Sequence, residues 1–222
     1  MTHAWRASES PALVVATKGG CVRPGGRWAV DGRPAHLRKA CEASLKALGV
    51  ARIDLYQLHA PDDRVRFEDS VGALAELRTA GKIAHVGLSN VSVAQIRAAQ
   101  AIVPIVSVQN RCNPYDLRAF REGVVAHCER EKIAFLPYSP VGGSRGVAQL
   151  RADPALGAVG AAHGATAPQV ALAWLLAKSS VTIPIPGASR AESAVSSFAA
   201  RQVVLTEAEL AELDAAFGLG TS

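Results

Sequence analysis

The sequence predicts an α/β fold in which short parallel strands alternate with helices. One observation is a series of apolar runs, as expected of buried parallel strands, each of which stops at a polar residue or a glycine. The six runs are LVVAT before Lys18, IDLYQL before His59, AHVGL before Ser89 and Asn90, VSV before Gln109, IAFLP before Tyr138, and TIPIP before Gly187. A second observation is the helical spacing of apolar residues between the runs, which indicates repeated βα units.

Start and stop signals place the helices between these strands. Apolar residues recur at helical spacing over residues 34–48 and about 67–80, and Gly49 and Gly81 follow as stop signals. Further helices are predicted after an N-cap at Ser92, over roughly 118–130, after a capping box at Thr166 and Gln169, and after a capping box at Thr206 and Glu209. Residues 142–152 are expected to form a short loop.

Two parallel architectures compete for this pattern, an open doubly wound sheet and a closed (β/α)8 TIM barrel. The Gly-x-Gly-x-x-Gly fingerprint of dinucleotide binding in open sheets does not follow the first run. Polar residues at every strand end, rather than at one crevice, favour the barrel, which binds its ligands at the carboxyl ends of the strands. A complete barrel has eight strands and roughly 250 residues. We therefore expect an incomplete barrel of about six βα units, forming one domain over residues 1–222.

Composition excludes several classes of protein. The net charge is +5, but the arginines are scattered and aromatic residues make up 5%, which argues against a nucleic-acid partner. The apolar runs are much shorter than the roughly 20 residues of a membrane span, and the first residues lack the pattern of a signal peptide. The four cysteines show no metal-binding spacing, so no metal is expected. The sequence predicts a cytoplasmic protein.

Six segments carry a resemblance to a known family. In chain order they are VVATKGG, RIDLYQLHAPD, GKIAHVGLSN, SVQNRCNPYDL, IAFLPYSPVGG and IPIPGASR. Together they resemble the aldo-keto reductase family over nearly the whole chain. The resemblance implies a TIM barrel and an oxidoreductase that transfers a hydride between NADPH and an aldehyde or ketone. The expected partner is thus a small carbonyl compound.

The resemblance also implies roles for individual residues. Lys18 and His59 match two of the four catalytic residues of the family. The cofactor-binding positions are Ser89, Asn90 and Gln109 for the nicotinamide carboxamide, Tyr138 for stacking on the nicotinamide ring, Ser139, Val141 and Gly143 beside the pyrophosphate, and Gly187, Ser189 and Arg190 at the 2′-phosphate.

The chemistry of these side chains agrees with the implied roles. Asn90 and Gln109 each offer a donor and an acceptor, which suits a carboxamide, and Arg190 at a helix start suits a phosphate. Each residue also has an ordinary structural interpretation. Taken alone, Lys18 is more typical of a solvated lysine at a strand end. Taken alone, His59 could equally be a hydrogen-bonded histidine of the core. The six strand ends taken together favour the shared site.

The chain departs from the family pattern near its start. The family places its proton-donating tyrosine, and an aspartate, upstream of the lysine strand, where about a dozen residues precede Leu13 here. We therefore expect the first two strands to be missing, either because the true start lies further upstream or because the protein is naturally shortened. Tyr56 and Asp54 cannot substitute, because strand alternation directs them away from the face of His59. Lys18 would then lack its carboxylate partner.

Three functional hypotheses remain open at this point. The first is an NADPH-dependent carbonyl reductase, with NADP favoured over NAD although Ser196 and Ser197 replace an acidic residue and an asparagine that are usual in the family. The second is a shortened, redox-inactive nucleotide-binding protein with a regulatory role. The third is a repurposed site in which His59 or Tyr138 performs acid–base chemistry. Unpaired strand edges also predict a possible homo-oligomer.

Overall fold

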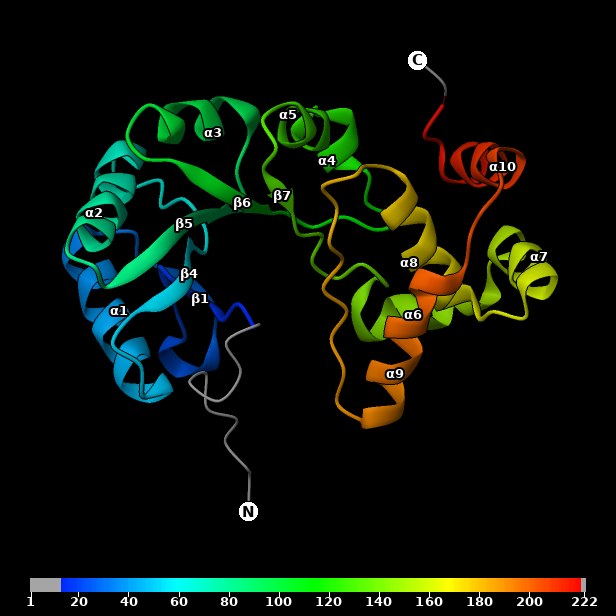
Figure 1. The fold of residues 1–222 in the computed structure, drawn as a ribbon, viewed down its shortest axis with the longest axis horizontal. Coiled ribbons are helices and arrows are strands. Elements are labelled where there is room, and N and C mark those ends of the chain that lie inside the picture. The colour runs from blue at the N-terminus through cyan, green and yellow to red at the C-terminus, as the bar shows by residue number, and fades with distance from the viewer. Residues whose placement is uncertain (1–12, 221–222) are drawn as a thin grey trace. The chain divides into compact units, whose positions relative to one another are not determined.

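The computed structural model describes residues 13–220, drawn in colour in Figure 1. By the density of its internal contacts the chain divides into two compact units, Met1–Val108 and Gln109–Ser222. Each unit is described separately below. The single domain predicted from the sequence stays a prediction.

The first unit is built on neighbouring strands that are hydrogen-bonded in the order β1, β4, β5, β6. The strands are β1 (Ala16–Gly19), β4 (Ile53–Leu58), β5 (Ile83–Ser89) and β6 (Ile105–Gln109), the last of which reaches the boundary between the units. The β1–β4 and β4–β5 pairs are parallel. Lys18 lies opposite Gln57, and Gln57 lies opposite Gly87, so these three positions share one face of the strands.

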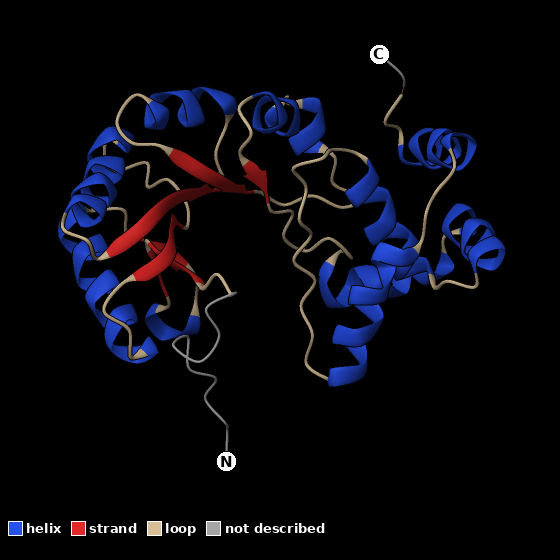
Figure 2. Ribbon diagram, in the orientation of Figure 1, coloured by secondary structure: helices blue, strands red, loops and turns tan. Residues whose placement is uncertain are grey.

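Three helices lie along the other face of these strands (Figures 1 and 2). They are α1 (Pro34–Leu48), α2 (Phe67–Thr79) and α3 (Val93–Gln100). The predicted signals are confirmed: Gly49 ends α1 in the left-handed conformation with φ 67°, and Ser92 and Gln95 form a capping box at the start of α3. Leu37 and Cys41 of α1 are completely buried, which fixes this helix on the strands.

The first strand begins later than the sequence predicts. The apolar run 13–17 is expected to be the strand, whereas β1 covers Ala16–Gly19 and includes Lys18. Leu13 and Val14 are 53% and 72% exposed, so these apolar side chains are not buried by a neighbour among the described residues. The strand consists of the residues that have parallel partners on β4, beginning with Ala16 opposite Leu55. Apolar character alone therefore misplaced the strand.

A short hairpin after β1 was not predicted. It consists of β2 (Cys21–Val22) and β3 (Ala29–Val30), paired antiparallel around the 3-10 turn η2 (Pro24–Gly26). The turn requires Gly25 at φ 58° and Gly26 at φ 79°, conformations that glycine adopts without steric cost. Its sequence signal is the Pro-Gly-Gly motif, but two-residue strands are too short to show periodicity.

The second unit is largely helical. Its elements are α4 (Arg118–Arg121), α5 (Val124–Arg130), β7 (Ala134–Phe135), α6 (Gly143–Ala152), α7 (Pro154–His163), α8 (Ala167–Ala177), α9 (Ala191–Ala199), η3 (Ala200–Gln202) and α10 (Glu207–Phe217). Helix α8 contacts α6, α7 and α9, and its Trp174 is completely buried. The predicted capping boxes at Thr166 and Thr206 are confirmed. Helix α8 is thus the core of this unit.

Three predictions in this unit need correction. The helix predicted over 118–130 is broken into α4 and α5, because Gly123 between them takes φ 74°. The loop predicted over 142–152 is helix α6 for nearly all of its length. The run TIPIP is not a continuous strand, and Thr182 and Ile185 form isolated bridges to Phe135 and Tyr138.

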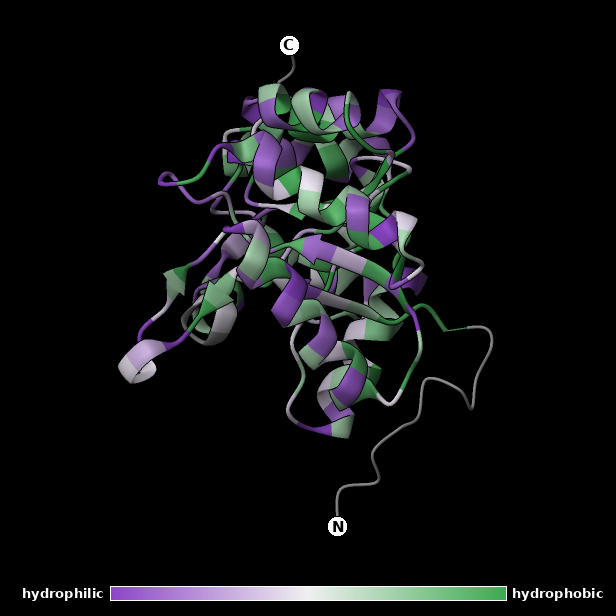
Figure 3. Ribbon diagram, turned by 90° about the vertical axis from the view of Figure 1, so that its left-hand side faces the viewer, coloured by the Kyte–Doolittle hydropathy of each residue, from purple (hydrophilic) through white to green (hydrophobic). Residues whose placement is uncertain are grey.

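Proline explains why the last run fails as a strand. Pro184 and Pro186 alternate with its other residues and have no backbone N–H to donate to a ladder. The N–H groups of Ile183 and Ile185, in contrast, donate to the carbonyls of Phe135 and Pro137. Along the helices, hydrophilic and hydrophobic segments alternate (Figure 3), as expected of helices with one buried face. No helix among residues 13–220 is long and apolar enough to cross a membrane.

Candidate active site

Lys18 and His59 lie at the same end of adjacent strands. Lys18 is in β1, two residues before Gly20, and His59 directly follows β4. The His59 amide donates to the carbonyl of Gly19 at 2.8 Å, which continues the parallel ladder beyond the strand. Because Lys18 lies opposite Gln57, and His59 is two residues after Gln57, both side chains belong to one face. The sequence prediction that these residues meet is consistent with this register.

The two side chains influence each other electrostatically. Burial lowers the pKa of the half-buried Lys18 ammonium, and the nearby Cys21 thiol opposes this shift. Burial also lowers the pKa of His59, and the positive charge of Lys18 lowers it further. The His59 imidazole is therefore neutral at pH 7 and can donate a hydrogen bond from one ring nitrogen. None of the ion pairs among residues 13–220 involves Lys18, which thus keeps an uncompensated charge.

Ser89 and Asn90 follow β5 beside His59. Ser89 is buried, and Asn90 is exposed with φ 58°. The Asn90 side-chain amide donates to the His59 carbonyl oxygen at 3.0 Å and to Ser89 Oγ at 3.2 Å. Asparagine tolerates the left-handed conformation better than most residues. The structure therefore brings three of the predicted residues into one hydrogen-bonded group in the first unit.

The floor of this face contains a polar pair that was not predicted. Gln57 Nε2 donates to Ser107 Oγ at 3.1 Å, and both residues are buried. Gly87 lies between them, and a Cβ at this position would meet Ser107 Oγ at 2.2 Å. Gln57 is the one polar residue inside the run IDLYQL apart from its aspartate and tyrosine. That Gln57 faces Ser107 becomes evident only from the strand register.

Trp28 of the hairpin is another residue that was not predicted. Its indole packs edge-to-face against the His59 imidazole, with ring centroids 5.8 Å apart and an interplanar angle of 67°. The guanidinium of Arg23 lies 4.3 Å from the centre of the same indole ring. The hairpin therefore forms an aromatic wall beside His59.

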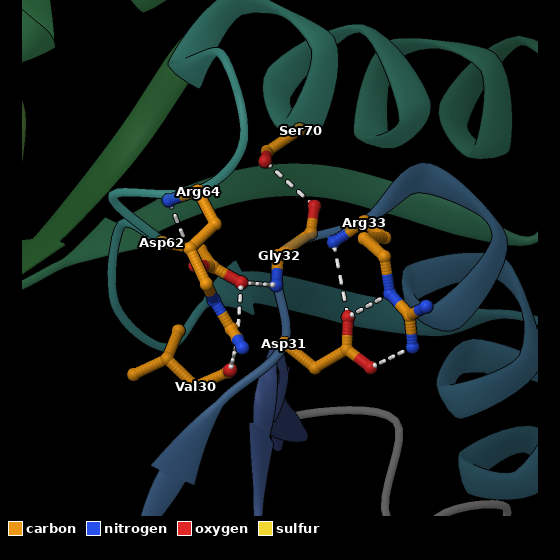
Figure 4. A network of polar contacts seen from close by, with 7 residues as sticks. All are labelled: Val30, Asp31, Gly32, Arg33, Asp62, Arg64 and Ser70. Atoms are coloured by element: carbon orange, nitrogen blue, oxygen red, sulfur yellow. Dashed lines mark hydrogen bonds and ion pairs between the residues drawn. The ribbon is translucent and has the colours of Figure 1, made fainter.

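One aspartate, Asp62, anchors the end of the hairpin to the loop after His59 (Figure 4). The buried Asp62 carboxylate accepts the Gly32 amide at 3.0 Å and the Arg64 Nε at 2.9 Å. Arg64 also donates to the Val30 carbonyl at 2.5 Å, which ties the end of β3 to this loop. These hydrogen bonds from Arg64 and Gly32 hold the pKa of Asp62 well below its usual range. The Arg33 side chain likewise lowers the pKa of Asp31 to about 2.

Tyr56 and Asp54 are placed as strand alternation predicts. Tyr56 is completely buried, and its hydroxyl has no hydrogen-bond partner among the described residues. A Cβ at Gly19 would meet that hydroxyl at 2.2 Å, so Tyr56 packs against the strand backbone. Burial raises the pKa of its hydroxyl. Asp54 accepts the Val15 amide at 3.0 Å and is thus engaged away from Lys18.

In the second unit, the segment after β7 carries Tyr138 and Ser139. Tyr138 is fixed by its backbone, since its amide donates to the Asn110 carbonyl and its carbonyl accepts the Cys112 amide. Ser139 takes φ 49°, and its carbonyl accepts the Asn113 side-chain amide at 3.1 Å. The predicted residues thus lie at an ordered bend. Gln109, at the end of β6, is buried.

The second unit also contains a pocket of about 490 Å³. Its lining includes Val141, Gly187 and Arg190, which the sequence assigned to the pyrophosphate and the 2′-phosphate, together with Ser196 and Ser197. Arg190 is the N-cap of α9, and a Cβ at Gly187 would meet nothing within 4 Å. The exposed Ser189 and Gly143 are sequence neighbours of this lining without being part of it. Guanidinium, backbone N–H groups and open space at a glycine suit a phosphate group.

Comparison of the sequence with known proteins identifies the family of the chain. Residues 4–217 match the sequence profile of the Aldo/keto reductase family. The chain belongs to the aldo/keto reductase family. An uncharacterized oxidoreductase of Schizosaccharomyces pombe is 37% identical over 203 residues, covering 91% of this chain and 65% of the yeast protein. "Probable aldo-keto reductase 1" of Glycine max is 34% identical over 235 residues, covering 94% of this chain and 68% of the soybean protein.

Solved structures confirm the fold. An aldo/keto reductase of Klebsiella pneumoniae in complex with NADP and acetate is 26% identical, with a TM-score of 0.78, over 92% of this chain and 70% of that chain. This chain therefore has the α/β fold of a family of TIM barrels, although the strands among residues 13–220 do not close a barrel. It spans about two thirds of the length of the relatives it matches. The yeast relative is named an oxidoreductase, and the soybean relative a probable aldo-keto reductase.

Proposed function

We propose that this aldo/keto reductase reduces an aldehyde or ketone to an alcohol, with NADPH as the cofactor. The observation that carries the proposal is the coupled pair of Lys18 and His59 at adjacent strand ends, with the Asn90 amide bonded to the His59 backbone. When bound, NADPH supplies a hydride to the carbonyl carbon. The remaining requirement is stabilisation of the charge that develops on the carbonyl oxygen.

The chain's own residues suit that requirement. The neutral His59 imidazole can donate a hydrogen bond to the carbonyl oxygen, which polarises the carbonyl before transfer. The Lys18 ammonium adds a positive charge that no carboxylate among the described residues offsets. Its lowered pKa also makes it a stronger acid than an ordinary lysine, so it can release a proton toward the alkoxide. Trp28 packs edge-to-face against the His59 ring and helps to hold its orientation.

For the cofactor, the pocket of the second unit supports the 2′-phosphate form. Arg190 and the start of α9 offer positive charge and N–H donors, and Gly187 leaves room for a phosphate oxygen. Glu192 also lines this pocket, and its charge opposes a phosphate. The proposal of NADP over NAD therefore requires that the attraction of Arg190 for the 2′-phosphate exceeds the repulsion from Glu192. The NADP complex of the Klebsiella relative is consistent with a nicotinamide cofactor.

A second candidate function follows from Tyr56. Its hydroxyl is packed against Gly19, so among residues 13–220 it cannot serve as the proton donor beside Lys18 and His59. This favours a nucleotide-binding protein without carbonyl turnover as the alternative. We also propose a cytoplasmic location, because all four cysteines are free thiols.

One experiment separates these candidates. NADPH binding is measured by titration, and NADPH oxidation is followed with a panel of aldehydes, for the wild type and for Lys18→Met. Reduction predicts turnover that is lost in the variant while NADPH binding persists. Binding without turnover in the wild type favours the alternative, and binding of neither NADPH nor NADH would contradict both.

A further inference from the structure

The hairpin after β1 has two different faces. In its antiparallel register Cys21 pairs with Val30 and Val22 with Ala29, so the next cross-strand pair is Arg23 with Trp28. Cross-strand neighbours lie on the same face, which explains why the Arg23 guanidinium rests on the Trp28 ring. Cys21 belongs to this face. Burial raises the pKa of its thiol, and the nearby positive charge of Lys18 partly opposes that increase. This face of the hairpin is therefore directed toward Lys18 and His59.

The opposite face serves a structural purpose. Val22 and Ala29 line a pocket of about 440 Å³ whose wall includes Asp62 and Arg64. The Arg64 hydrogen bond to the Val30 carbonyl closes the base of the hairpin onto the loop after His59. The position of Trp28 relative to His59 is therefore set by main-chain anchoring and not by side-chain packing alone.

The catalytic-facing side is cationic and open. Residues 21–30 include Arg23 and Arg27 and contain no acidic residue. Trp28 is 65% exposed although one side of its indole carries a guanidinium. None of the ion pairs among the described residues involves Arg23. An exposed aromatic ring with an uncompensated guanidinium beside it is suited to a planar, negatively charged ligand.

We infer that Arg23 and Trp28 select the substrate, favouring carbonyl compounds that carry an anionic group on a flat ring. This inference rests on the proposed reductase function. The ring of the substrate stacks beside Trp28, its carboxylate or phosphate pairs with Arg23, and its carbonyl group is directed to His59. Both residues act as specificity-determining residues, because hydride transfer itself does not involve them.

The test uses 4-carboxybenzaldehyde and the uncharged 4-methylbenzaldehyde in the wild type, Arg23→Gln and Arg27→Gln. The two variants remove the same charge from the same hairpin, but it is the Arg23 guanidinium that lies over the Trp28 ring. We expect Arg23→Gln to lower kcat/KM for the charged aldehyde about tenfold, mainly through KM, and to leave the uncharged one within about twofold. Arg27→Gln should change neither aldehyde more than about twofold. Equal losses in both variants, or equal losses for both aldehydes, would overturn the inference.

A binding measurement separates this inference from the reductase proposal. Terephthalate, a dicarboxylate that cannot be reduced, is titrated while tryptophan fluorescence is recorded, with Trp28→Phe to identify the signal of Trp28. Tenfold weaker binding in Arg23→Gln, with Arg27→Gln unchanged, supports the site even if no aldehyde is turned over. Equal terephthalate affinity in the wild type and Arg23→Gln overturns it even if aldehydes are reduced.

Discussion

The groups assigned to carbonyl chemistry and those assigned to the nucleotide are built differently. In the first unit, the backbone of His59 is bonded to Gly19 and Asn90, and its ring packs on Trp28. In the second unit, Ser189 and Arg190 are exposed, and no hydrogen bond or ion pair among residues 13–220 holds their side chains. Groups that stabilise a transition state need fixed positions, whereas groups that grip a phosphate can become ordered when it binds. The comparison predicts large effects from the first group and smaller ones from the second.

After the loss of turnover expected for Lys18→Met, the largest effect is expected for His59→Phe. The phenyl ring keeps the packing on Trp28 but removes the hydrogen-bond donor at the carbonyl oxygen. Loss of one such donor costs about 10²–10³ in kcat, which steady-state NADPH oxidation measures. His85→Phe, at an exposed position on β5, is the control and should keep wild-type rates. Retention of activity in His59→Phe would show that this side chain has no part in the reaction.

A loss of stability follows for Gly19→Ala. The new Cβ would lie 2.2 Å from the Tyr56 hydroxyl and 2.9 Å from its ring carbon, inside a packed core. Overpacking of this kind lowers the free energy of unfolding by about 2–3 kcal/mol, which urea denaturation detects. Gly72→Ala in α2 is the matched control, because nothing lies within 4 Å and alanine favours a helix. Adding Tyr56→Phe should recover part of the loss.

The anchor of the hairpin is tested by Asp62→Asn. The substitution weakens the charge-assisted bonds to Gly32 and Arg64, and we expect about 2 kcal/mol less stability. Asp63→Asn, exposed next to it, should change stability by less than about 0.5 kcal/mol. Thermal unfolding of both variants provides the measurement. Similar melting temperatures for the two variants would mean that the network is not a stabilising anchor.

The sequence predicts some elements of the fold and of the candidate site but not others. Helix α1 was predicted completely, because proline and glycine mark its ends and its apolar residues recur at helical spacing. Helix α6 was missed, because Gly142, Gly143 and Gly146 suggest a loop. The bond between Gln57 and Ser107 depends on the register of strands that are distant in sequence, which local patterns do not contain. The site residues themselves could be assigned through family resemblance, but Trp28 could not.

A smaller effect is expected for Arg190→Gln. Removing one exposed cation from the pocket of the second unit should weaken the binding of NADPH about tenfold and the binding of NADH about twofold or less. Fluorescence titration with both nucleotides measures the ratio of the dissociation constants. Arg151→Gln, also on the pocket lining, controls for general loss of positive charge. Equal weakening of NADPH and NADH would remove Arg190 from the 2′-phosphate site.

The smallest effect concerns pH. The pKa of His59 is lowered from 6.5, and its neutral form is the active one, so activity should fall only as the pH drops below 6.5. The pKa of Lys18 is lowered from 10.5, and its charged form is the active one, so activity should also fall on the alkaline side before pH 10.5. Between pH 7 and 6 the change in kcat/KM is a few-fold at most. Activity that rises with acidification through pH 6 would contradict this assignment.

The most direct test of hydride transfer uses NADPH deuterated at both C4 positions, with 4-carboxybenzaldehyde as substrate. Hydride transfer from the cofactor should leave one deuterium on the carbinol carbon of every alcohol formed, and Lys18→Met should form no alcohol. NADPH binding without any deuterated alcohol from the wild type would contradict it.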